Sequence, residues 1–436
     1  MTAEFLIEAR WLIPIEPEKQ TLENHSLVIG QGKIIDLLPK DAARARYPNI
    51  TVIERPHHVL LPGLVNSHTH AAMNLLRGIA DDLPLMDWLE KHIWPLEQQW
   101  VGAEFVRVGG ELAMAEMLKS GTTCFNDMYL FPETLAQAAS KHGIRAAIGL
   151  IVIDFPTAWA PTANEYLEKG LALYDRLHHE PLLSWLFAPH APYTVSDAPL
   201  SRLKTLADQL ELKIHMHVHE TLGEVEQAVA QTGRRPLARL HELGLVDDSL
   251  IAVHMTQLTD DEIEQLARAG TSIVHCPESN LKLASGFAPI ARCLDAGINV
   301  ALGTDGAASN NDLNMLGEMR TAALVAKAVA GDATALPAHQ ALRMATLNGA
   351  KALGLDEQIG SLVPGKAADM IAIDLNDLET QPLYCPASQL VYSASRDQVS
   401  DVWVAGKALL KDKRLTTFDL GALSAEVKAW RDKLKA

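Results

Sequence analysis

The sequence predicts an α/β protein built on a TIM-like (β/α)8 barrel, with a small β-sandwich domain formed by both ends of the chain. Three observations lead to this prediction. Strand-like apolar segments alternate with helix-like segments through the middle of the chain, and the strand-like segments number eight. Both ends instead contain short strand-like segments separated by turns.

The ends of the chain share a β-type pattern. Their strand-like segments cover residues 5–15, 25–39, 361–375 and 399–410, with turn glycines at Gly30, Gly32, Gly365 and Gly406. Gly30 and Gly32 indicate a hairpin. Chain termini commonly lie close together in a folded domain. We therefore expect a discontinuous β-sandwich domain of residues 1–60 plus 358–436, around a barrel domain of residues 61–357.

The eight middle segments are apolar runs that end in polar residues. They are VLLPGLVNSHTH (59–70), TTCFNDMY (122–129), IRAAIGLIV (144–152), LLSWLFAPH (182–190), KIHMHVHE (213–220), SLIAVHMT (249–256), TSIVHCPES (271–279) and INVALGTDG (298–306). Helix-period segments separate most of them, as at residues 104–121, 198–211 and 258–270. The last of these starts with an Asp/Glu cluster and closes with a glycine, as helices often do.

Composition excludes several classes of function. The chain has 436 residues and a net charge of −16, and a surface that acidic repels nucleic acid. Its four cysteines form no CxxC pair, which favours a reduced, cytoplasmic protein without a thiolate zinc site. The first residues lack the order of a signal peptide, and no apolar run approaches the ~20 residues that span a bilayer, so we expect no membrane contact.

Polar side chains mark the carboxyl ends of the predicted strands, where barrel enzymes carry their chemistry. These strand-end residues are His68, His70, His190, His215, His217, His219, Glu220, His254, His275, Thr304 and Asp305. Histidines scattered over a surface would not fall repeatedly at the same end of successive strands. The pattern therefore predicts a functional site at one end of the barrel.

His68 and His70 are two residues apart, so both imidazoles can face the barrel lumen. Two imidazoles from one strand form a natural half of a site for zinc, iron or a related ion. The alternative is a polar strand end whose hydrogen bonds are satisfied within the protein. The other strand-end groups favour the metal site.

The fifth and eighth strands offer further ligands. His215, His217 and His219 share one strand face, and His217 is favoured near the metal because it lies three residues before Glu220. His215 and His219 are expected to pack and hydrogen-bond around the site. Asp305 ends an apolar strand, where a buried carboxylate needs a partner such as a metal ion and its water. The alternative is an ordinary strand-to-helix turn.

Five segments carry a resemblance to a known group of enzymes. PGLVNSHTH, HMHVHE, the His254 of IAVH, HCPESNLKLASG and GTDGAASNN resemble motifs of the amidohydrolase superfamily. More narrowly, the chain resembles its 5′-methylthioadenosine/S-adenosylhomocysteine deaminase branch, which is similar to guanine deaminases and triazine chlorohydrolases. The resemblance covers nearly the whole chain, including terminal segments that form one small β-sandwich in the family.

The resemblance implies a site with one divalent metal ion per subunit. His68, His70, His217 and Asp305 would hold the ion, with zinc as the default and iron or manganese able to support similar chemistry. Family members with two metals commonly use a modified lysine on the fourth strand. Here that strand, LLSWLFAPH, contains no lysine, which favours a single ion.

The resemblance also implies roles for the remaining groups. Glu220 would carry a proton to a ring nitrogen, His254 would hold and polarise the attacking water, and Asp305 would take that water's proton. Glu97 would accept hydrogen bonds from the ribose hydroxyls, and His190 would contact the substrate. Some relatives have an arginine after the third strand that contacts the nucleoside. GLIVIDFPTAWAP offers none here, so contacts to the tail of the substrate stay open.

The segment after the first strand, residues 73–97, is rich in large apolar side chains. They are Met73, Leu75, Leu76, Leu85, Trp88 and Trp94. One interpretation is a lid whose apolar wall suits a purine face and a thioether. The other is an amphipathic helix pair that packs on the barrel.

The leading hypothesis is hydrolytic deamination of an adenine nucleoside, an aminohydrolase reaction on a cyclic amidine. We expect 5′-methylthioadenosine to yield 5′-methylthioinosine and ammonia, with S-adenosylhomocysteine and adenosine as related substrates. A guanine or pterin deaminase or a triazine-type chlorohydrolase is the alternative, but Glu97 suits a vicinal diol, which those substrates lack. A non-catalytic metal-binding scaffold would need neither Glu220 nor His254. The sequence leaves the oligomeric state open, and a homodimer or larger homo-oligomer is compatible with it.

Overall fold

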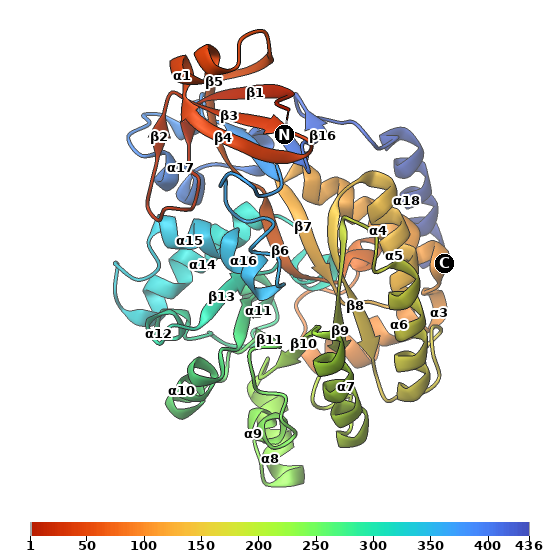
Figure 1. The fold of residues 1–436 in the computed structure, drawn as a ribbon. Helices are drawn as coiled ribbons and strands as arrows, with labels where there is room; N and C mark the ends of the chain where they lie inside the picture. The colour runs from red at the N-terminus through yellow and green to blue at the C-terminus, as the bar shows by residue number, and fades with distance from the viewer. Residues whose placement is uncertain (1, 436) are drawn as a thin grey trace.

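The structure is a computed structural model that describes residues 2–435 of the chain. It combines an eight-stranded parallel barrel with a nine-stranded mixed sheet that lies at one end of the barrel (Figure 1). Red and blue strands meet in this sheet, because both ends of the chain contribute to it (Figure 1). The predicted fold class is confirmed.

The barrel strands pair in chain order, each parallel to the next. They are β6 (Leu64–Thr69), β7 (Thr122–Asp127), β8 (Arg145–Val152), β9 (Leu183–Pro189), β10 (Lys213–Val218), β11 (Leu250–His254), β12 (Ser272–His275) and β13 (Asn299–Leu302). All eight predicted segments therefore contain a barrel strand. Segment 59–70 is divided at Gly63, because β5 (Thr51–Pro62) belongs to the mixed sheet.

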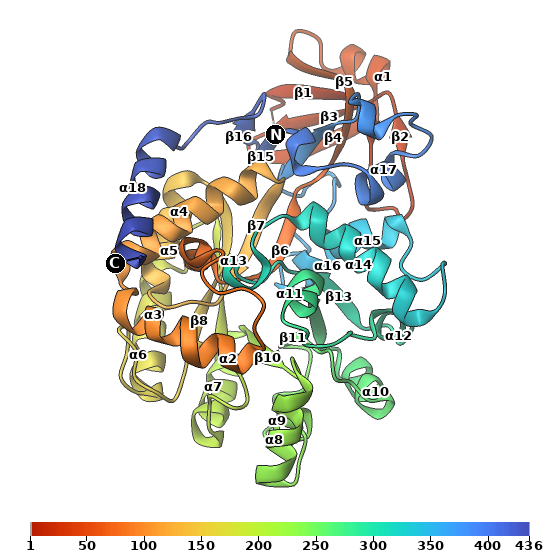
Figure 2. The same ribbon diagram turned by 180° about the vertical axis from the view of Figure 1, so that it is seen from behind.

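Helices follow the barrel strands and cover them from outside (Figures 1 and 2). They are η1 (Ala71–Leu76), α2 (Leu85–Trp88), η2 (Leu89–Ile93), α3 (Trp94–Trp100), α4 (Ala103–Lys119), α5 (Pro132–His142), α6 (Ala163–Leu177), α7 (Asp197–Leu210), α8 (Leu222–Thr232), α9 (Pro236–Glu242), α10 (Asp260–Ala269), α11 (Pro277–Lys282), α12 (Ile290–Asp295), α13 (Ala307–Asn310), α14 (Met315–Ala330), α15 (Ala338–Met344) and α16 (Leu347–Ala352). The predicted start and end signals of α10 are confirmed. Thr259 and Glu262 form a capping box, and Gly270 closes the helix in a left-handed conformation.

The barrel strands read as apolar runs because helices and lumen bury both of their faces. In β8, for example, every residue is buried. The last strand approaches the first closely at Gly303, where a Cβ atom would lie 2.8 Å from Cβ of His68. The backbone N–H of Asp305 donates to the carbonyl of His68 over 3.0 Å. The glycine thus lets the end of β13 reach β6, and so brings Asp305 to the histidines of the first strand.

The mixed sheet is built from both ends of the chain. Its strands are β1 (Phe5–Leu12), β2 (Leu22–Glu23), β3 (His25–Gly30), β4 (Lys33–Pro39), β5, β14 (Met370–Asp374), β15 (Val399–Val404), β16 (Lys407–Lys411) and β17 (Arg414–Leu415), with α1 (Lys40–Arg46) after β4. β5 joins the two ends, since it pairs parallel with β1 and antiparallel with β14. The predicted hairpin turn between β3 and β4 is present, and Gly32 takes a positive φ of 73° there.

Apolar side chains from both ends form a common core inside this sheet. Ile7 and Leu27 come from the N-terminal strands, whereas Met370 and Trp403 come from the C-terminal strands, and all four belong to one buried cluster. The sheet joins the barrel through a buried ion pair, in which Nε of Arg145 lies 2.9 Å from Oδ2 of Asp369. Arg145 opens β8, so this contact lies at the end of the barrel opposite the predicted site.

The C-terminal segment contributes helices to the barrel as well as strands to the sheet. Its helical elements are η3 (Leu378–Thr380), α17 (Pro386–Tyr392), η4 (Arg396–Gln398) and α18 (Leu420–Leu434). α17 packs on α14 and α15, while α18 lies along α4 (Figure 2). Residues 358–435 therefore include elements that cover the barrel beside strands of the mixed sheet.

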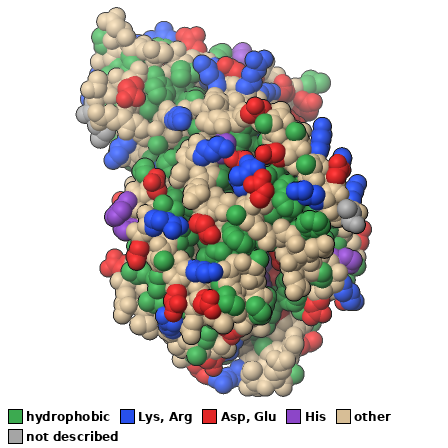
Figure 3. All heavy atoms as spheres, turned by 90° about the vertical axis from the view of Figure 1, so that its right-hand side faces the viewer, with side chains coloured by type: hydrophobic (Ala, Val, Ile, Leu, Met, Phe, Trp, Pro, Cys, Tyr) green, Lys and Arg blue, Asp and Glu red, His purple; other side chains and the backbone are tan. Residues whose placement is uncertain are grey.

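The surface carries both signs of charge. On the face drawn in Figure 3, acidic and basic side chains are interspersed with apolar and polar ones. Within residues 2–435, no helix is long and apolar enough to cross a membrane.

Candidate active site

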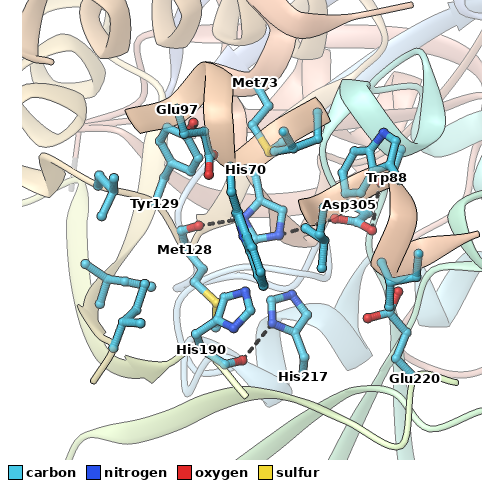
Figure 4. Close-up of a pocket in the computed structure, with 18 of the residues that line it drawn as sticks. His70, Met73, Trp88, Glu97, Met128, Tyr129, His190, His217, Glu220 and Asp305 are labelled. Atoms are coloured by element: carbon cyan, nitrogen blue, oxygen red, sulfur yellow. Dashed lines mark hydrogen bonds and ion pairs between the residues drawn. The ribbon is translucent and has the colours of Figure 1, made fainter. Parts of the chain in front are cut away.

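Four predicted metal ligands meet at the carboxyl ends of the barrel strands, and three of them, His70, His217 and Asp305, are labelled in Figure 4. Nε2 of His68 lies 3.2 Å from Nε2 of His217 and 3.4 Å from Oδ1 of Asp305. Nε2 of His70 lies 3.4 Å from the same carboxylate oxygen. Ligand atoms about 2.0–2.1 Å from a zinc ion in a tetrahedral site are spaced by about 3.3 Å from one another. Three strands that are far apart in the sequence thus bring together donor atoms at the spacing of a metal site.

Backbone carbonyls orient two of these imidazoles. Nδ1 of His70 donates to the carbonyl of Met128 at 2.5 Å, and Nδ1 of His217 donates to the carbonyl of His190 at 2.7 Å. A proton on Nδ1 leaves the Nε2 lone pair free, and in both residues Nε2 is the atom that faces the other ligands. Such outer hydrogen bonds fix the tautomer and ring orientation of metal-binding histidines.

His215 and His219 lie behind the site, as the sequence predicts. Nε2 of His215 lies 2.8 Å from Nδ1 of His68, so it supports the ligand from the interior of the barrel. His219 points to the other side, where its Nε2 accepts the backbone N–H of Leu237 at 3.1 Å. The prediction that His219 shares a strand face with His215 and His217 is wrong, because β10 ends at Val218 and His219 takes a left-handed φ of 52°. Of these three histidines only His217 lines the pocket.

Two serines that sequence reasoning missed orient Asp305. The hydroxyls of Ser279 and Ser309 donate to Oδ2 at 2.6 and 3.0 Å. The backbone N–H of Gly306 donates to Oδ1 at 2.7 Å, and Asp305 itself takes a left-handed φ of 62°. With Oδ2 occupied by hydroxyls, Oδ1 is the oxygen that faces His68 and His70. Ser279 lies in α11 and Ser309 in α13, and the sequence alone does not mark either as a partner of Asp305.

The protonation states suit a divalent cation. Burial lowers the pKa of His68 to about 4 and that of His217 well below its usual value, so both imidazoles are neutral at pH 7. Burial alone would raise the pKa of Asp305, but contacts with His68 hold it well below its usual value. Neutral imidazoles and an ionised carboxylate are the forms that bind metal. The donor set therefore fits a single ion of the zinc type.

His254 also lies within reach of the ligand atoms. One ring nitrogen of His254 lies within 4.8 Å of a ring nitrogen of His68 and of one of His217. The donor atoms of His68, His70 and Asp305 also lie within 4.8 Å of one another. Nδ1 of His254 meets Oδ1 of Asn280 at 2.8 Å, which sequence reasoning also missed. Nε2 faces Glu220 across 3.7 Å.

Glu220 lies on the pocket wall beside the metal ligands (Figure 4). Its carboxyl is buried, and burial together with the nearby charge of Asp305 raises its pKa to about 8. The group is therefore mostly protonated at neutral pH and can donate a proton to a bound molecule. Such a shift at a pocket wall is typical of catalytic acids.

Glu97 and His190 also line the pocket. Glu97 lies on α3, and its Oε1 accepts a hydrogen bond from the hydroxyl of Tyr129 at 2.6 Å. In Figure 4 the Glu97 carboxylate and Glu220 lie on opposite sides of the metal ligands. Nδ1 of His190 meets Oγ1 of Thr194 at 3.0 Å, and burial lowers the pKa of His190 to about 3. His190 therefore presents a neutral ring to the cavity.

The apolar wall comes largely from the segment after β6. We call residues 71–100, from η1 to α3, the cover segment. Its members Met73, Leu85, Trp88, Leu89, Ile93 and Trp94 line the pocket, together with Leu130, Ile151, Ile153, Phe155 and Leu283 from other elements. The prediction of an apolar wall is thus confirmed for Met73, Leu85, Trp88 and Trp94. Leu75 and Leu76 pack into the core instead.

His275 is a strand-end histidine whose side chain makes no hydrogen bond to the described groups of the site. His275 is buried at the end of β12, but among the described residues it is not one of those that line the cavity. The strand is only four residues long, and the chain turns directly into α11. The polar groups that β12 and α11 bring to the site are Ser279 and Asn280 rather than His275.

Comparisons with known proteins agree with this geometry. The family model described as "Amidohydrolase family" matches residues 59–409. A 5-methylthioadenosine/S-adenosylhomocysteine deaminase of Teredinibacter turnerae is 52% identical over 435 residues, covering 100% of this chain and 98% of the relative. Its counterpart in Saccharophagus degradans is 47% identical, covering 100% of this chain and 97% of the relative.

Solved structures also resemble this chain over nearly its whole length. An adenosine deaminase from Xanthomonas campestris with bound zinc superposes with a TM-score of 0.98 at 54% identity, covering 99% of this chain and 98% of that one. An atrazine chlorohydrolase from Arthrobacter aurescens in complex with zinc gives a TM-score of 0.91 at 26% identity, covering 98% of this chain and 100% of that one. On its fold and these matches, the chain belongs to the amidohydrolase family.

Proposed function

We propose that this protein is a metal-dependent aminohydrolase that deaminates adenine nucleosides. The preferred reaction converts 5′-methylthioadenosine and water into 5′-methylthioinosine and ammonia, and S-adenosylhomocysteine and adenosine are related substrates. The names of the full-length relatives and of the zinc-bound Xanthomonas structure support this proposal. The observation that carries it is a single pocket with a metal-type donor set, a protonated Glu220 on one side and the Glu97 carboxylate on the other.

In this proposal His68, His70, His217 and Asp305 hold one divalent ion, zinc by preference. A divalent ion held there supplies Lewis acidity, which makes water a nucleophile at neutral pH. Asp305 takes the proton of the attacking water, since its Oδ1 faces the site while the serine hydroxyls hold Oδ2. His254 orients that water through Nε2, because its Nδ1 is engaged by Asn280.

Glu220 supplies the second proton transfer. It protonates the ring nitrogen beside the attacked carbon, so that the ring does not accumulate negative charge when the C–O bond forms. The proton taken from water then passes from Asp305 to the exocyclic amine, the C–N bond breaks and ammonia leaves. The added hydroxyl gives its remaining proton to Glu220 as the carbonyl forms, which restores both carboxyl groups. The raised pKa of Glu220, about 8, supports the role of proton donor at neutral pH.

Glu97 is proposed to accept hydrogen bonds from the ribose 2′- and 3′-hydroxyls, and His190 to contact the base. A carboxylate can accept two hydrogen bonds side by side, which matches a vicinal diol. Because guanine, pterins and triazines carry no ribose, Glu97 favours the nucleoside reaction over those of the more distant relatives. The apolar wall of Trp88, Trp94 and Phe155 suits a thioether tail.

The test is ammonia release by the zinc-loaded protein with 5′-methylthioadenosine, S-adenosylhomocysteine, adenosine, guanine and pterins, together with chloride release from a chlorotriazine. We expect turnover of the nucleosides. Glu97→Ala should lower kcat/KM for 5′-methylthioadenosine by about 10- to 100-fold, because hydrogen bonds to a charged group contribute about 1.5–3 kcal/mol. Activity on guanine or triazine alone would contradict the proposal, and so would an unchanged kcat/KM in Glu97→Ala.

The domain boundaries, the cellular compartment and the assembly of the protein are also part of this proposal. The catalytic domain is the barrel of residues 61–357, with residues 1–60 plus 358–436 as the second domain. The protein works in the cytoplasm, which its scattered cysteines favour. A homodimer or larger homo-oligomer is the proposed assembly, and light scattering of the purified protein tests it.

A further inference from the structure

The C-terminal helix α18 contacts the junction between the cover segment and the barrel. The chain ends beside α3 in both ribbon views, although α3 and α18 are more than three hundred positions apart in the sequence (Figures 1 and 2). α18 packs along α4 and also touches η1. The last part of the chain therefore lies against the elements that lead into and out of the pocket cover.

Trp430 is the residue of α18 that spans this junction. Its side chain is buried, and its ring centroid lies 5.3 Å from that of Phe105 at an interplanar angle of 86°. The ring of Trp100 lies 6.3 Å away at 88°. Both pairs have the edge-to-face arrangement that aromatic rings prefer. Trp100 is the last residue of α3 and Phe105 lies in the first turn of α4, so one indole contacts both sides of the junction.

The junction consists of two residues, of which Val101 is buried in the core. Only Val101 and Gly102 separate α3 from α4, and Gly102 is fully extended, with a φ of −161°. A Cβ atom at Gly102 would meet no other atom within 4 Å. The backbone bonds nearby, from Val101 N–H to Glu97 and from Val106 N–H to Gly102, each lie within one helix end. They do not fix the angle between the two helices.

α18 is itself well anchored to the barrel. The guanidinium of Arg107 on α4 lies 3.0 Å from the carboxylate of Glu426 on α18. Leu423 is buried two turns before Trp430 on the same face of the helix. These contacts hold α18, and Trp430 with it, against α4 of the barrel.

We propose that Trp430 is a positioning residue, which holds α3 against the barrel and so keeps Glu97 at its place on the pocket wall. Glu97 precedes Trp100 by three residues, so the two side chains move together with the helix. The inference rests on the proposed function, in which Glu97 binds the ribose hydroxyls. It assigns a role in substrate recognition to a helix that does not touch the pocket.

The test compares adenosine with 2′,3′-dideoxyadenosine, which lacks the hydroxyls that Glu97 would bind. In Trp430→Ala we expect KM for adenosine to rise about 10-fold, which corresponds to about 1.4 kcal/mol, with kcat changed by less than about 2-fold. KM for the dideoxy nucleoside should stay the same. Trp430→Phe retains an aromatic edge and should restore most of the affinity for adenosine.

Leu423→Ala is the matched control. Leu423 is buried on the same helix but lines a separate hollow with Leu112 and Ala115 of α4, away from α3. This variant should lose stability without changing the ratio of the two KM values. If Trp430→Ala does not fold, Trp430→Leu replaces it, and circular dichroism and zinc content verify each variant.

Two results would overturn the inference alone, with the wild type active. One is an equal rise of KM, or no rise, for both nucleosides in the Trp430 variant. The other is a rise of KM for adenosine, but not for the dideoxy nucleoside, in Leu423→Ala. A wild type that deaminates neither these two nucleosides nor 5′-methylthioadenosine would instead contradict the proposed function, and the inference would fall with it.

Discussion

The mixed sheet and the barrel mouth both bury carboxylates, but they give them different neighbours. In the sheet, Glu8 lies 2.7 Å from Arg44, and Asp401 lies 2.5 Å from Arg55. The hydrogen bond from Arg44 lowers the pKa of Glu8 below its usual value. In the barrel mouth, burial raises the pKa of Glu220 to about 8, and none of the described residues that line its pocket is a lysine or an arginine.

This difference separates a structural use of buried charge from a chemical one. A buried charge without a partner is costly, so a region that only has to fold satisfies each carboxylate within the protein. The barrel mouth leaves Oδ1 of Asp305 and the carboxyl of Glu220 facing a cavity. In the proposed reaction the ion and the substrate are further partners of these two groups.

Removing the metal should give the largest effect. Dialysis against a chelator is expected to abolish deamination to the detection limit, because the four ligands then hold nothing that activates water. The fold should persist, since the mixed sheet and the barrel core use no ion. Ammonia release and circular dichroism measure the two properties, and added zinc should restore turnover. Full activity in protein whose metal content is verified as zero would contradict the chemical role that we assign to the barrel mouth.

Glu220→Gln should give the next largest effect. The amide cannot deliver a proton to the ring, so kcat should fall by about 100- to 10,000-fold, while KM changes little. Glu226→Gln, an exposed position on α8, is the matched control and should behave as the wild type. Steady-state kinetics with 5′-methylthioadenosine distinguish the two variants, and an undiminished kcat in Glu220→Gln would refute the proton-donor role.

Arg55→Met tests the structural side of the comparison. Asp401 is fully buried, so loss of its partner should destabilise the protein by about 3–5 kcal/mol. Urea unfolding measures this loss, whereas kcat per folded molecule should not change. The double variant Arg55→Met with Asp401→Asn removes the unpaired charge and should recover part of the stability. Arg431→Met breaks only an exposed pair and should cost less than about 0.5 kcal/mol.

The pH dependence of stability should give the smallest effect. Burial alone would raise the pKa of Asp401, but hydrogen bonds from Arg55 and Ser400 hold it below its usual value. A lowered folded-state pKa contributes stability that is present above the unfolded value of ~3.9 and is lost as the pH falls through the folded value. Urea unfolding from pH 6 to pH 3 should therefore show a decline that is shallower in the Arg55→Met variant. An equal decline in both proteins would show that this pair does not contribute.

The sequence was sufficient to predict the eight barrel strands, because helix-covered parallel strands leave continuous apolar runs. His68, His70, His217 and Asp305 could be predicted for a related reason, since polar groups that end such runs have few structural uses. Ser279, Ser309 and Asn280 could not, because hydroxyl and amide residues are common in turns and only the tertiary structure shows what they contact.

The sequence also did not predict how side chains of the helical segments pack. Leu75 and Leu85 look alike in the cover segment, yet only Leu85 lines the pocket, because a stretch of short helical turns has no single period. The contact between Trp430 and Trp100 joins distant parts of the chain, and no local pattern in the sequence encodes it.

The pairing of β5 with β14 has a consequence for synthesis of the chain. Pro62 lies opposite Met370, so one partner leaves the ribosome long before the other is made. At about 5–20 residues per second the delay is roughly 15–60 seconds. During that interval β5 presents an unpaired edge, which is a template for association with other chains. A chain truncated before Met370 would keep that edge permanently and is expected to aggregate, as light scattering during refolding would reveal.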